Sequence, residues 1–372
     1  TSHLHHLAFS KDISATLGAA GRLCARVTTG ENDAVVEGLG RFLPVDAPVD
    51  CCESGSTLRF CIPAALLQGG SAAFTGARRL MERGVGIYED LLLPRGVMVS
   101  KTPESITFSG KLTPGDYTLR GDVSSQFVTG LLLALPLLPG DSDITVTGEA
   151  VSRPYVQMTL AVLARHGVTV EKITDGWHIP GGQFCRPAPL LDEPDWSAAA
   201  YWLVLRALLP RQRREALRIP LAPPPYLQGD AAILRYLDKL PEQIDISDTP
   251  DLLPPLALYA ALRPGRDTCF THAAFLRQKE SDRLTAVSAV LNALGASAEV
   301  QPDGLVIHGV SALHGGDVSA CGDHRIALLA GCAAMVADGP VTLSGAETVA
   351  KSYPAFWREL AALGGNWEVL ES

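Results

Sequence analysis

Apolar residues recur at helical spacing in several stretches of the chain. In one stretch they are Leu284, Val287, Leu291 and Leu294. Near the end of the chain they are Phe356, Leu360 and Leu363. Side chains at this spacing form one face of a helix, and a Gly follows both stretches, as is common just after a helix end. The pattern predicts amphipathic helices in both places.

Short runs of alternating polarity separate the helical patterns. DITVTG (143–148) and GLVIHG (304–309) are examples, and alternation with a period of two predicts strands. The run FVTGLLLALPLLPG (127–140) is almost wholly apolar, but it is too short to span a bilayer and contains Pro136. We interpret it as a buried helix.

Helix and strand patterns recur together as a repeat. A basic or polar cluster, an amphipathic helix, a small residue and a β-rich run follow one another, roughly 70 residues apart with one shorter gap of about 55. The repeats end at residues 21–28, 95–100, 165–172, 237–246, 293–300 and 362–370. Six such units predict an α/β chain with three units in each of two domains, and we expect the domain boundary near 192–203.

Composition narrows the classes of function. The chain has 372 residues, of which 47% are hydrophobic, which is ample for two domains. A net charge of −9 argues against a general nucleic-acid or membrane binder. The eight Cys include no CxxC pair and the nine His show no metal-binding spacing, so we expect free thiols in a reducing cytoplasm and no metal. No signal peptide is visible.

Charged and small polar residues gather where the repeats begin their helices. These clusters are ESGSTLRF (53–60), RRLMERG (78–84), SRPY (152–155), RQKESDR (277–283), GDHRIA (322–327) and AKSYP (350–354). Helix N-termini attract anions, and Arg forks suit phosphate and carboxylate groups. One cluster alone is typical of a solvated helix start, whereas six that converge on one cleft predict an anionic ligand. Asp251, before another apolar helix, is either an N-cap or a functional carboxylate.

With these motifs in view, the chain resembles the 5-enolpyruvylshikimate-3-phosphate synthase family over essentially its whole length. RQKESDRL, GDVSSQF (121–127) and GDHRIA are the most distinctive motifs. The resemblance implies an α/β fold of two domains, 1–193 and 194–372, each with three repeated βαβαββ units around an active-site cleft. It also implies transfer of the enolpyruvyl group of phosphoenolpyruvate to the 5-hydroxyl of shikimate 3-phosphate by addition and elimination, without a metal or organic cofactor. That reaction belongs to the shikimate pathway of aromatic amino-acid biosynthesis.

The resemblance assigns roles residue by residue. It implies that shikimate 3-phosphate is bound by Ser124, Ser125, Gln126, Ser152, Tyr155, Asp251 and Lys279. It implies that phosphoenolpyruvate is bound by Gly55, Arg83, Gln126, Arg283, Arg325 and Lys351. The implied catalytic residues are Asp251, at the reacting hydroxyl, and Glu280, which transfers a proton at the methylene carbon. Arg59 and His324 have supporting roles.

The start of the chain departs from the family pattern. Family members begin with a strand and a helix start of the form SKSxxxR, whose Lys contacts phosphoenolpyruvate, and the Ser10-Lys11 pair does not correspond to it. The resemblance therefore predicts that the chain begins downstream of this segment and can lack activity. It also predicts a sheet edge that is either unpaired or repaired.

Two alternatives stay open at this point. The sister enolpyruvyl transferase that acts on UDP-N-acetylglucosamine shares the fold, but the loop 77–84 lacks the Cys of that family. A non-catalytic remnant of the same fold is the other alternative. We expect a cytoplasmic monomer with small-molecule substrates and no nucleic-acid or membrane partner. The basic stretch 211–218 is interpreted as a solvated connection.

Overall fold

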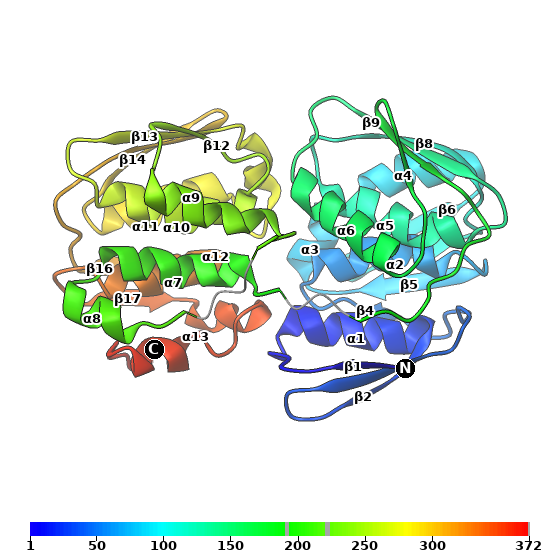
Figure 1. Cartoon of the computed structure of the whole chain (residues 1–372), viewed down its shortest axis with the longest axis horizontal. Coiled ribbons are helices and arrows are strands. Elements are labelled where there is room, and N and C mark those ends of the chain that lie inside the picture. The colour runs from blue at the N-terminus through cyan, green and yellow to red at the C-terminus, as the bar shows by residue number, and fades with distance from the viewer. Residues whose placement is uncertain (190–192, 220–223, 371–372) are drawn as a thin grey trace. The chain divides into compact units, whose positions relative to one another are not determined.

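The computed structural model describes residues 1–189, 193–219 and 224–370. It divides into two compact units, Thr1–Leu191 and Asp192–Ser372, which run from blue to green and from green to red in Figure 1. Each unit is an α/β structure in which helices pack against mixed sheets.

The first unit begins with a three-stranded sheet. Its order is β1 (Ser2–Leu4), β3 (Ala34–Gly38) and β2 (Ala25–Thr29), all antiparallel, with α1 (Lys11–Leu23) between the first two strands in the chain. The side chain of Ser10 caps α1 by accepting a hydrogen bond from the Ile13 N–H, 3.2 Å away. Because β1 pairs with β3, residues from the start of the chain cover that edge of the sheet.

Two four-stranded sheets of the same design complete the first unit. Their orders are β4-β5-β7-β6 and β8-β9-β11-β10, with a parallel first pair and antiparallel pairs after it. The elements are β4 (Val49–Asp50), α2 (Gly55–Ala65), β5 (Ser71–Thr75), α3 (Arg78–Arg83), α4 (Gly86–Leu92), η1 (Leu93–Arg95), β6 (Met98–Lys101), β7 (Ser105–Ser109), β8 (Gly115–Arg120), α5 (Ser125–Ala134), η2 (Leu135–Leu137), β9 (Ser142–Thr147), α6 (Arg153–Arg165), β10 (Glu171–Ile173) and β11 (Gly176–Ile179).

The second unit contains the same four-stranded sheet once, in the order β12-β13-β15-β14, and a parallel pair, β16-β17. Its elements are α7 (Trp196–Leu208), α8 (Arg211–Ala216), η3 (Gly229–Ala232), α9 (Ile233–Asp238), β12 (Gln243–Asp245), η4 (Pro250–Leu252), α10 (Leu253–Ala261), β13 (Asp267–Thr271), η5 (Ala274–Gln278), α11 (Arg283–Ala293), β14 (Ser297–Gln301), β15 (Gly304–His308), β16 (Gly316–Ser319), α12 (His324–Ala334), β17 (Val341–Ser344), η6 (Ala346–Lys351) and α13 (Phe356–Ala362). Within the described residues, three βαβαββ units are therefore complete, and α1 with β1–β3 and α12 with β16–β17 form shorter versions.

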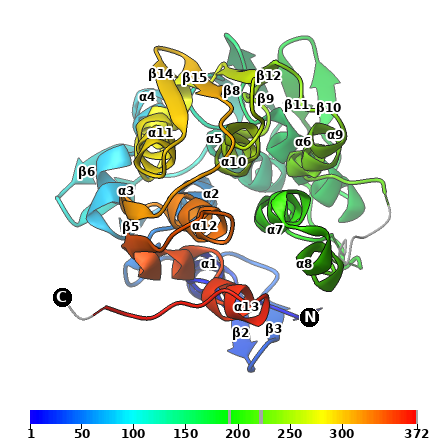
Figure 2. The same cartoon turned by 90° about the vertical axis from the view of Figure 1, so that its left-hand side faces the viewer.

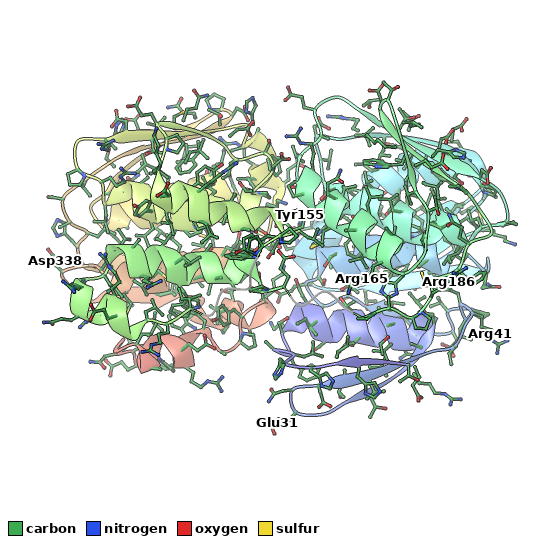
Figure 3. All side chains as sticks on the ribbon, viewed as in Figure 1. Glu31, Arg41, Tyr155, Arg165, Arg186 and Asp338 are labelled. Carbon is green, nitrogen blue, oxygen red and sulfur yellow. The ribbon has the colours of Figure 1, made fainter. Side chains whose placement is uncertain are left out.

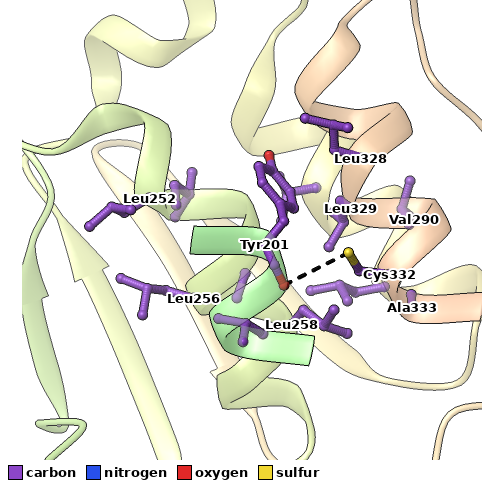
Figure 4. Close-up of a cluster of buried hydrophobic side chains, with 14 of the residues drawn as sticks. Tyr201, Leu252, Leu256, Leu258, Val290, Leu328, Leu329, Cys332 and Ala333 are labelled. Atoms are coloured by element: carbon purple, nitrogen blue, oxygen red, sulfur yellow. Dashed lines mark hydrogen bonds between the residues drawn. The ribbon is translucent and has the colours of Figure 1, made fainter. Parts of the chain in front are cut away.

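Apolar helices fill the core of the second unit. Helices α7, α10, α11 and α12 are seen nearly end-on in Figure 2, and their facing side chains form one buried cluster. Figure 4 shows part of it, where the Cys332 thiol lies 3.9 Å from the carbonyl oxygen of Tyr201. Tyr201 is 1% exposed, and its hydroxyl donates to the Arg325 carbonyl oxygen at 3.0 Å. This core therefore sets the position of the first turn of α12.

The local predictions can be compared with these elements. The helices expected around 284–294 and 356–363 are α11 and α13, and the strands expected at 143–148 and 304–309 are β9 and β15. The buried helix expected within 127–140 is α5. The solvated connection expected at 211–218 contains a short helix, α8, in which Arg211 and Glu215 form an i,i+4 ion pair of 3.0 Å, and the side chains of residues 211–215 are exposed as expected.

The eight thiols are all free, as expected, and they differ in burial. Cys51 and Cys332 are buried, whereas Cys185 and Cys321 are exposed. Within the described residues, no group of three or more His, Cys, Asp or Glu side chains is placed to hold a metal ion. In the same part of the chain, no helix combines the length and apolarity needed to cross a bilayer.

The start of α11 yields a stability prediction. Asp282 is its N-cap, and one carboxylate oxygen accepts a hydrogen bond from the Thr285 N–H at 3.2 Å while the other pairs with Arg277 at 2.8 Å. We expect Asp282→Ala to lower the free energy of unfolding by about 1 kcal/mol, because a backbone donor loses its partner. Asp282→Asn, which keeps the cap and removes the charge, should lie close to wild type. Urea unfolding followed by circular dichroism measures both, and equal losses in the two variants would contradict the cap.

Candidate active site

Arg283 is the centre of a charged cluster in the second unit. It is the first residue of α11 and only 1% exposed, yet three carboxylates surround its guanidinium group. Nη1 donates to Asp251 Oδ1 at 2.8 Å, Nη2 donates to Glu280 Oε2 at 3.0 Å, and Nε donates to Asp323 Oδ2 at 3.0 Å. A planar guanidinium has five N–H donors, so it can hold several carboxylates in a fixed geometry.

Asp251 is shared between two arginines. It lies in η4, before α10, and its second oxygen accepts a hydrogen bond from Arg325 Nη2 at 2.7 Å. Burial alone would raise the pKa of Asp251, but the positive charges of Arg325 and Arg283, with a smaller effect of Lys279, hold it well below its usual value. The carboxylate is therefore ionised throughout the physiological range, and its side chain does not act as an N-cap.

Glu280 is held by two cations. Besides Arg283, the Lys351 ammonium group donates to Glu280 Oε1 at 2.7 Å. Lys351 ends η6 and is 3% exposed, while the Glu280 side chain is 17% exposed. A carboxylate with both oxygens bonded and some access to solvent is well placed to exchange a proton with a bound molecule.

Asp323 was not among the residues that the sequence singled out. It is fully buried and has three contacts: it holds Arg283, accepts from the Ser281 hydroxyl at 3.1 Å, and accepts from the Arg325 N–H at 2.9 Å as the N-cap of α12. One carboxylate therefore joins the starts of two helices that carry the arginines. The sequence signal that could have identified Asp323 is its place in GDHRIA, directly before the start of an expected helix, where an N-cap residue stands.

His324 lies beside this cluster without joining its hydrogen bonds. It is 5% exposed, and its Nδ1 lies 3.6 Å from Asp323 Oδ1, which is too long for a hydrogen bond. Burial, followed by the positive charge of Arg325, lowers the pKa of His324 to about 3. The imidazole is therefore neutral at physiological pH.

This buried His predicts an acid sensitivity. The unfolded chain takes up a proton on His324 near pH 6.5, whereas the folded chain does not until about pH 3, so stability falls as the pH drops between these values. At pH 5 the loss due to this residue is about 2 kcal/mol. We expect His324→Asn to flatten the decrease in melting temperature between pH 7 and pH 5, measured by calorimetry. Parallel curves for the variant and wild type would contradict a neutral buried imidazole.

A second group of predicted residues converges in the first unit, at the start of α2. Gly55 is the first residue of this helix, and a Cβ atom there would lie 2.6 Å from Arg59 Nη1, 3.3 Å from Gln126 Oε1 and 3.7 Å from Arg83 Nη1. Arg59 Nη1 donates to Gln126 Oε1 at 2.7 Å. A helix N-terminus without a side chain, next to two arginines, is suited to a small anion.

A close contact between α2 and α5 positions Arg59 and Gln126. A Cβ at Gly130 of α5 would lie 2.4 Å from the Arg59 carbonyl oxygen and 2.2 Å from the Tyr88 hydroxyl, so no larger residue fits. The Tyr88 hydroxyl lies 2.8 Å from the Arg59 carbonyl oxygen and 3.1 Å from the Phe127 carbonyl oxygen, so its single proton is shared between these two acceptors. One tyrosine thus connects the two helices directly behind the predicted site residues.

The predicted serines lie at two further helix starts in the first unit. Ser124 is the N-cap of α5 and accepts from the Gln126 N–H at 3.3 Å, and the buried Ser125 follows it. Ser152 precedes α6 with a positive φ of 58°, and its side chain does not cap the helix. Tyr155, labelled in Figure 3, lies in the first turn of α6. The structure therefore places these four predicted residues at the starts of α5 and α6.

Comparison with known proteins identifies the family. A family model described as EPSP synthase (3-phosphoshikimate 1-carboxyvinyltransferase) matches residues 1–243 and 227–360. A protein named 3-phosphoshikimate 1-carboxyvinyltransferase from Clostridium kluyveri is 38% identical over 395 aligned positions, which cover 99% of this chain and 91% of that protein. A protein of the same name from Clostridium acetobutylicum is 36% identical and covers 98% of this chain and 90% of its own length. The chain belongs to the EPSP synthase family.

Solved structures show the same fold. An EPSP synthase from Acinetobacter baumannii superposes with a TM-score of 0.74 at 22% identity and covers 98% of this chain and 90% of its own. The enolpyruvyl transferase NikO from Streptomyces tendae gives 0.71 at 18% identity, with 98% and 97% coverage. The predicted enolpyruvyl transferase fold is therefore confirmed.

The remaining residue predicted from the resemblance to EPSP synthases is Lys279. Lys279 follows η5, its ammonium group lies 5.5 Å from the centre of the Phe275 ring, and its charge acts on Asp251. The roles of these residues toward substrates stay predictions. Asp323, Ser281 and Tyr88 are the positioning residues that sequence reasoning missed.

Proposed function

We propose that this protein transfers the enolpyruvyl group of phosphoenolpyruvate to the 5-hydroxyl of shikimate 3-phosphate and releases inorganic phosphate, as the names of its relatives suggest. The observation that carries the proposal is the buried cluster around Arg283. It combines the cations Arg283, Arg325 and Lys351 with two partly exposed carboxylates, Asp251 and Glu280. This set suits two anionic substrates and a proton transfer.

The proposed reaction proceeds in two steps. In the addition, the 5-oxygen forms a bond to C2 of phosphoenolpyruvate, the hydroxyl loses its proton and the methylene carbon gains one. In the elimination, the bond from C2 to the phosphate oxygen breaks, the new methyl group loses a proton and the double bond forms again. Phosphate leaves with its electron pair, so no oxidant or reductant is needed.

The second unit supplies the proton-transfer groups in this proposal. The ionised Asp251 accepts a hydrogen bond from the 5-hydroxyl and so orients it. Glu280 exchanges a proton with the methylene carbon. Lys351, 2.7 Å from Glu280, can restore that proton. Arg283 and Arg325 stabilise negative charge on the carboxylate and phosphate of phosphoenolpyruvate.

The first unit supplies the rest of the proposed substrate contacts. Gly55, Arg83 and Gln126 would contact phosphoenolpyruvate. Ser124, Ser125, Ser152 and Tyr155, with Gln126, would contact shikimate 3-phosphate, as Lys279 would from the second unit.

Phosphate release tests the proposal. We expect release only when both shikimate 3-phosphate and phosphoenolpyruvate are present, and none when UDP-N-acetylglucosamine replaces the former. Arg325→Met should lower kcat/KM by about a hundredfold or more, because a charged contact to the substrate is lost. Arg211→Met, at an exposed position on α8, is the matched control and should match wild type. No release from wild type, or release with the nucleotide sugar, would contradict the proposal.

We further propose a cytoplasmic monomer without nucleic-acid or membrane partners. Its net charge of −9 opposes binding to polyanionic surfaces. Size-exclusion chromatography with light scattering should give a mass near 39.4 kDa. A mass of twice that value at micromolar concentration would contradict the monomer.

A further inference from the structure

The first unit contains a cavity whose apolar part has no role in the proposed reaction, although Ser124 and Ser125 form part of its wall. Its volume is about 200 Å³, and it lies between the first turns of α5 and α6, the loop 148–151 and the β10–β11 hairpin. The apolar part of its wall is formed by Val128, Val146, Ala150, Val151, Val156 and Trp177. An apolar cavity of about 150 Å³ is enough to hold a benzene ring. The space therefore fits one small ring.

Charged residues line the same cavity. Lys172 and Trp177 are directly opposite each other on β10 and β11, and the Lys172 ammonium group lies 4.5 Å from the centre of the Trp177 ring. Arg153 and Gln157 contribute from one face of α6, and Asp175 contributes from the turn of the hairpin. The Lys172 ammonium group thus lies beside the apolar wall, which favours a ligand that carries a negative charge.

The shape of the cavity is set by the backbone around it. The Val146 N–H donates to the Asp175 carbonyl oxygen at 2.7 Å, and the Val151 N–H donates to the Gly121 carbonyl oxygen at 3.1 Å. A Cβ at Gly121 would lie 2.8 Å from Ala150 Cα, so the loop packs tightly there. These backbone contacts hold the walls of the cavity in place and leave its interior open. A cavity that is already formed lowers the entropic cost of ligand binding.

We propose that this cavity is a second ligand site, which takes a small apolar ring with one carboxylate group. The ring occupies the space between Val128, Val156 and Trp177, and the carboxylate pairs with Lys172. Ser124 and Ser125 form one wall of the cavity and also belong to the predicted shikimate 3-phosphate group. An occupant is therefore in a position to alter the affinity for that substrate. The proposal does not depend on catalytic activity.

Benzoate is the probe that tests this site, without any turnover. In a two-dimensional NMR spectrum we expect benzoate to shift the indole signal of Trp177, which Trp177→Phe identifies among the five Trp signals. Lys172→Gln should weaken binding by about fivefold, as should replacement of benzoate by neutral benzamide. Lys111→Gln, at an exposed position in the same unit, is the matched control and should bind as wild type. Val156→Phe should abolish binding because it fills the space.

Three results would overturn the proposal. The first is a Trp177 signal that does not move at about 50 mM benzoate, a concentration that reveals even millimolar affinity. The second is that Lys172→Gln and Lys111→Gln bind benzoate with equal affinity. This comparison tests the proposal even if Val156→Phe fails to fold. The third is stoichiometric displacement of benzoate by shikimate 3-phosphate, which would make the cavity part of the substrate site.

Discussion

Replacement of Arg283 with Met is expected to lower the free energy of unfolding by about 3–5 kcal/mol and to abolish activity. The variant leaves Asp251, Glu280 and Asp323 close together, and each loses the cation that it contacts at 2.8–3.0 Å. Removing one member of a buried charge network costs this much because the remaining charges lose their compensation. The melting temperature of the second unit should fall by about 10 °C.

The geometry of Arg283 can be separated from its charge. Arg283→Lys keeps one positive charge but cannot bond three carboxylates at once, so its stability should lie between wild type and Arg283→Met. Arg206→Met removes an exposed arginine of the same unit and is the control, with an expected change below about 0.5 kcal/mol. Calorimetry on the three variants is the measurement. Similar melting temperatures for Arg283→Met and Arg206→Met would show that the cluster does not stabilise the fold.

Glu280→Gln is expected to lower kcat by about 10²–10⁴-fold and to lower the free energy of unfolding by about 1–3 kcal/mol, because one of the two cations loses its acceptor. Glutamine has the same shape, and its amide oxygen can still accept from the Lys351 ammonium group, but its NH2 group cannot accept from Arg283 and the amide cannot take up or release a proton at neutral pH. Substrate binding, measured by calorimetric titration of phosphoenolpyruvate with shikimate 3-phosphate present, should change by less than about tenfold. The loss should therefore appear in kcat rather than in KM.

The control for Glu280→Gln is Glu347→Gln, an exposed position in η6, the same short helix that holds Lys351. Its kcat should equal that of wild type. If Glu280→Gln kept kcat within about threefold, Glu280 would be a positioning residue and proton transfer would fall to another group. Uptake of solvent deuterium into the methylene group of recovered phosphoenolpyruvate reports on the same step, and it should disappear in Glu280→Gln.

Local patterns were enough for most of the elements that carry the site. The helix α11 follows from apolar residues at helical spacing, Asp282 as its cap and Gly295 after its end. The strands β9 and β15 follow from alternation, because their neighbouring side chains face opposite sides of a sheet. The motifs around Gly55, Arg283 and Arg325 pointed to anion binding, since each places cations or small residues at a helix start. Neighbours in sequence determine all these properties.

Local patterns did not reveal every element. The stretch 211–218 was expected to be a solvated connection, and it contains a short helix with an ion pair between Arg211 and Glu215. The three complete βαβαββ units could be expected from the repeats, but the pairing of β1 with β3 depends on residues 30 or more positions apart. Such contacts leave no periodic signal.

By itself, the sequence determined the class of fold, the repeated units, the helix starts and the family to which they belong. Only the tertiary structure decided which charges share a hydrogen bond. Arg325 and Asp251 are 74 residues apart and Lys351 and Glu280 are 71 apart, and packing alone brings each pair within 2.7 Å. The role of Asp323, the contact of Gly130 with α2 and the cavity beside Trp177 likewise arise where separate elements meet. Spacing along one element is fixed by covalent geometry, whereas distances between elements follow from how their side chains fill a common core.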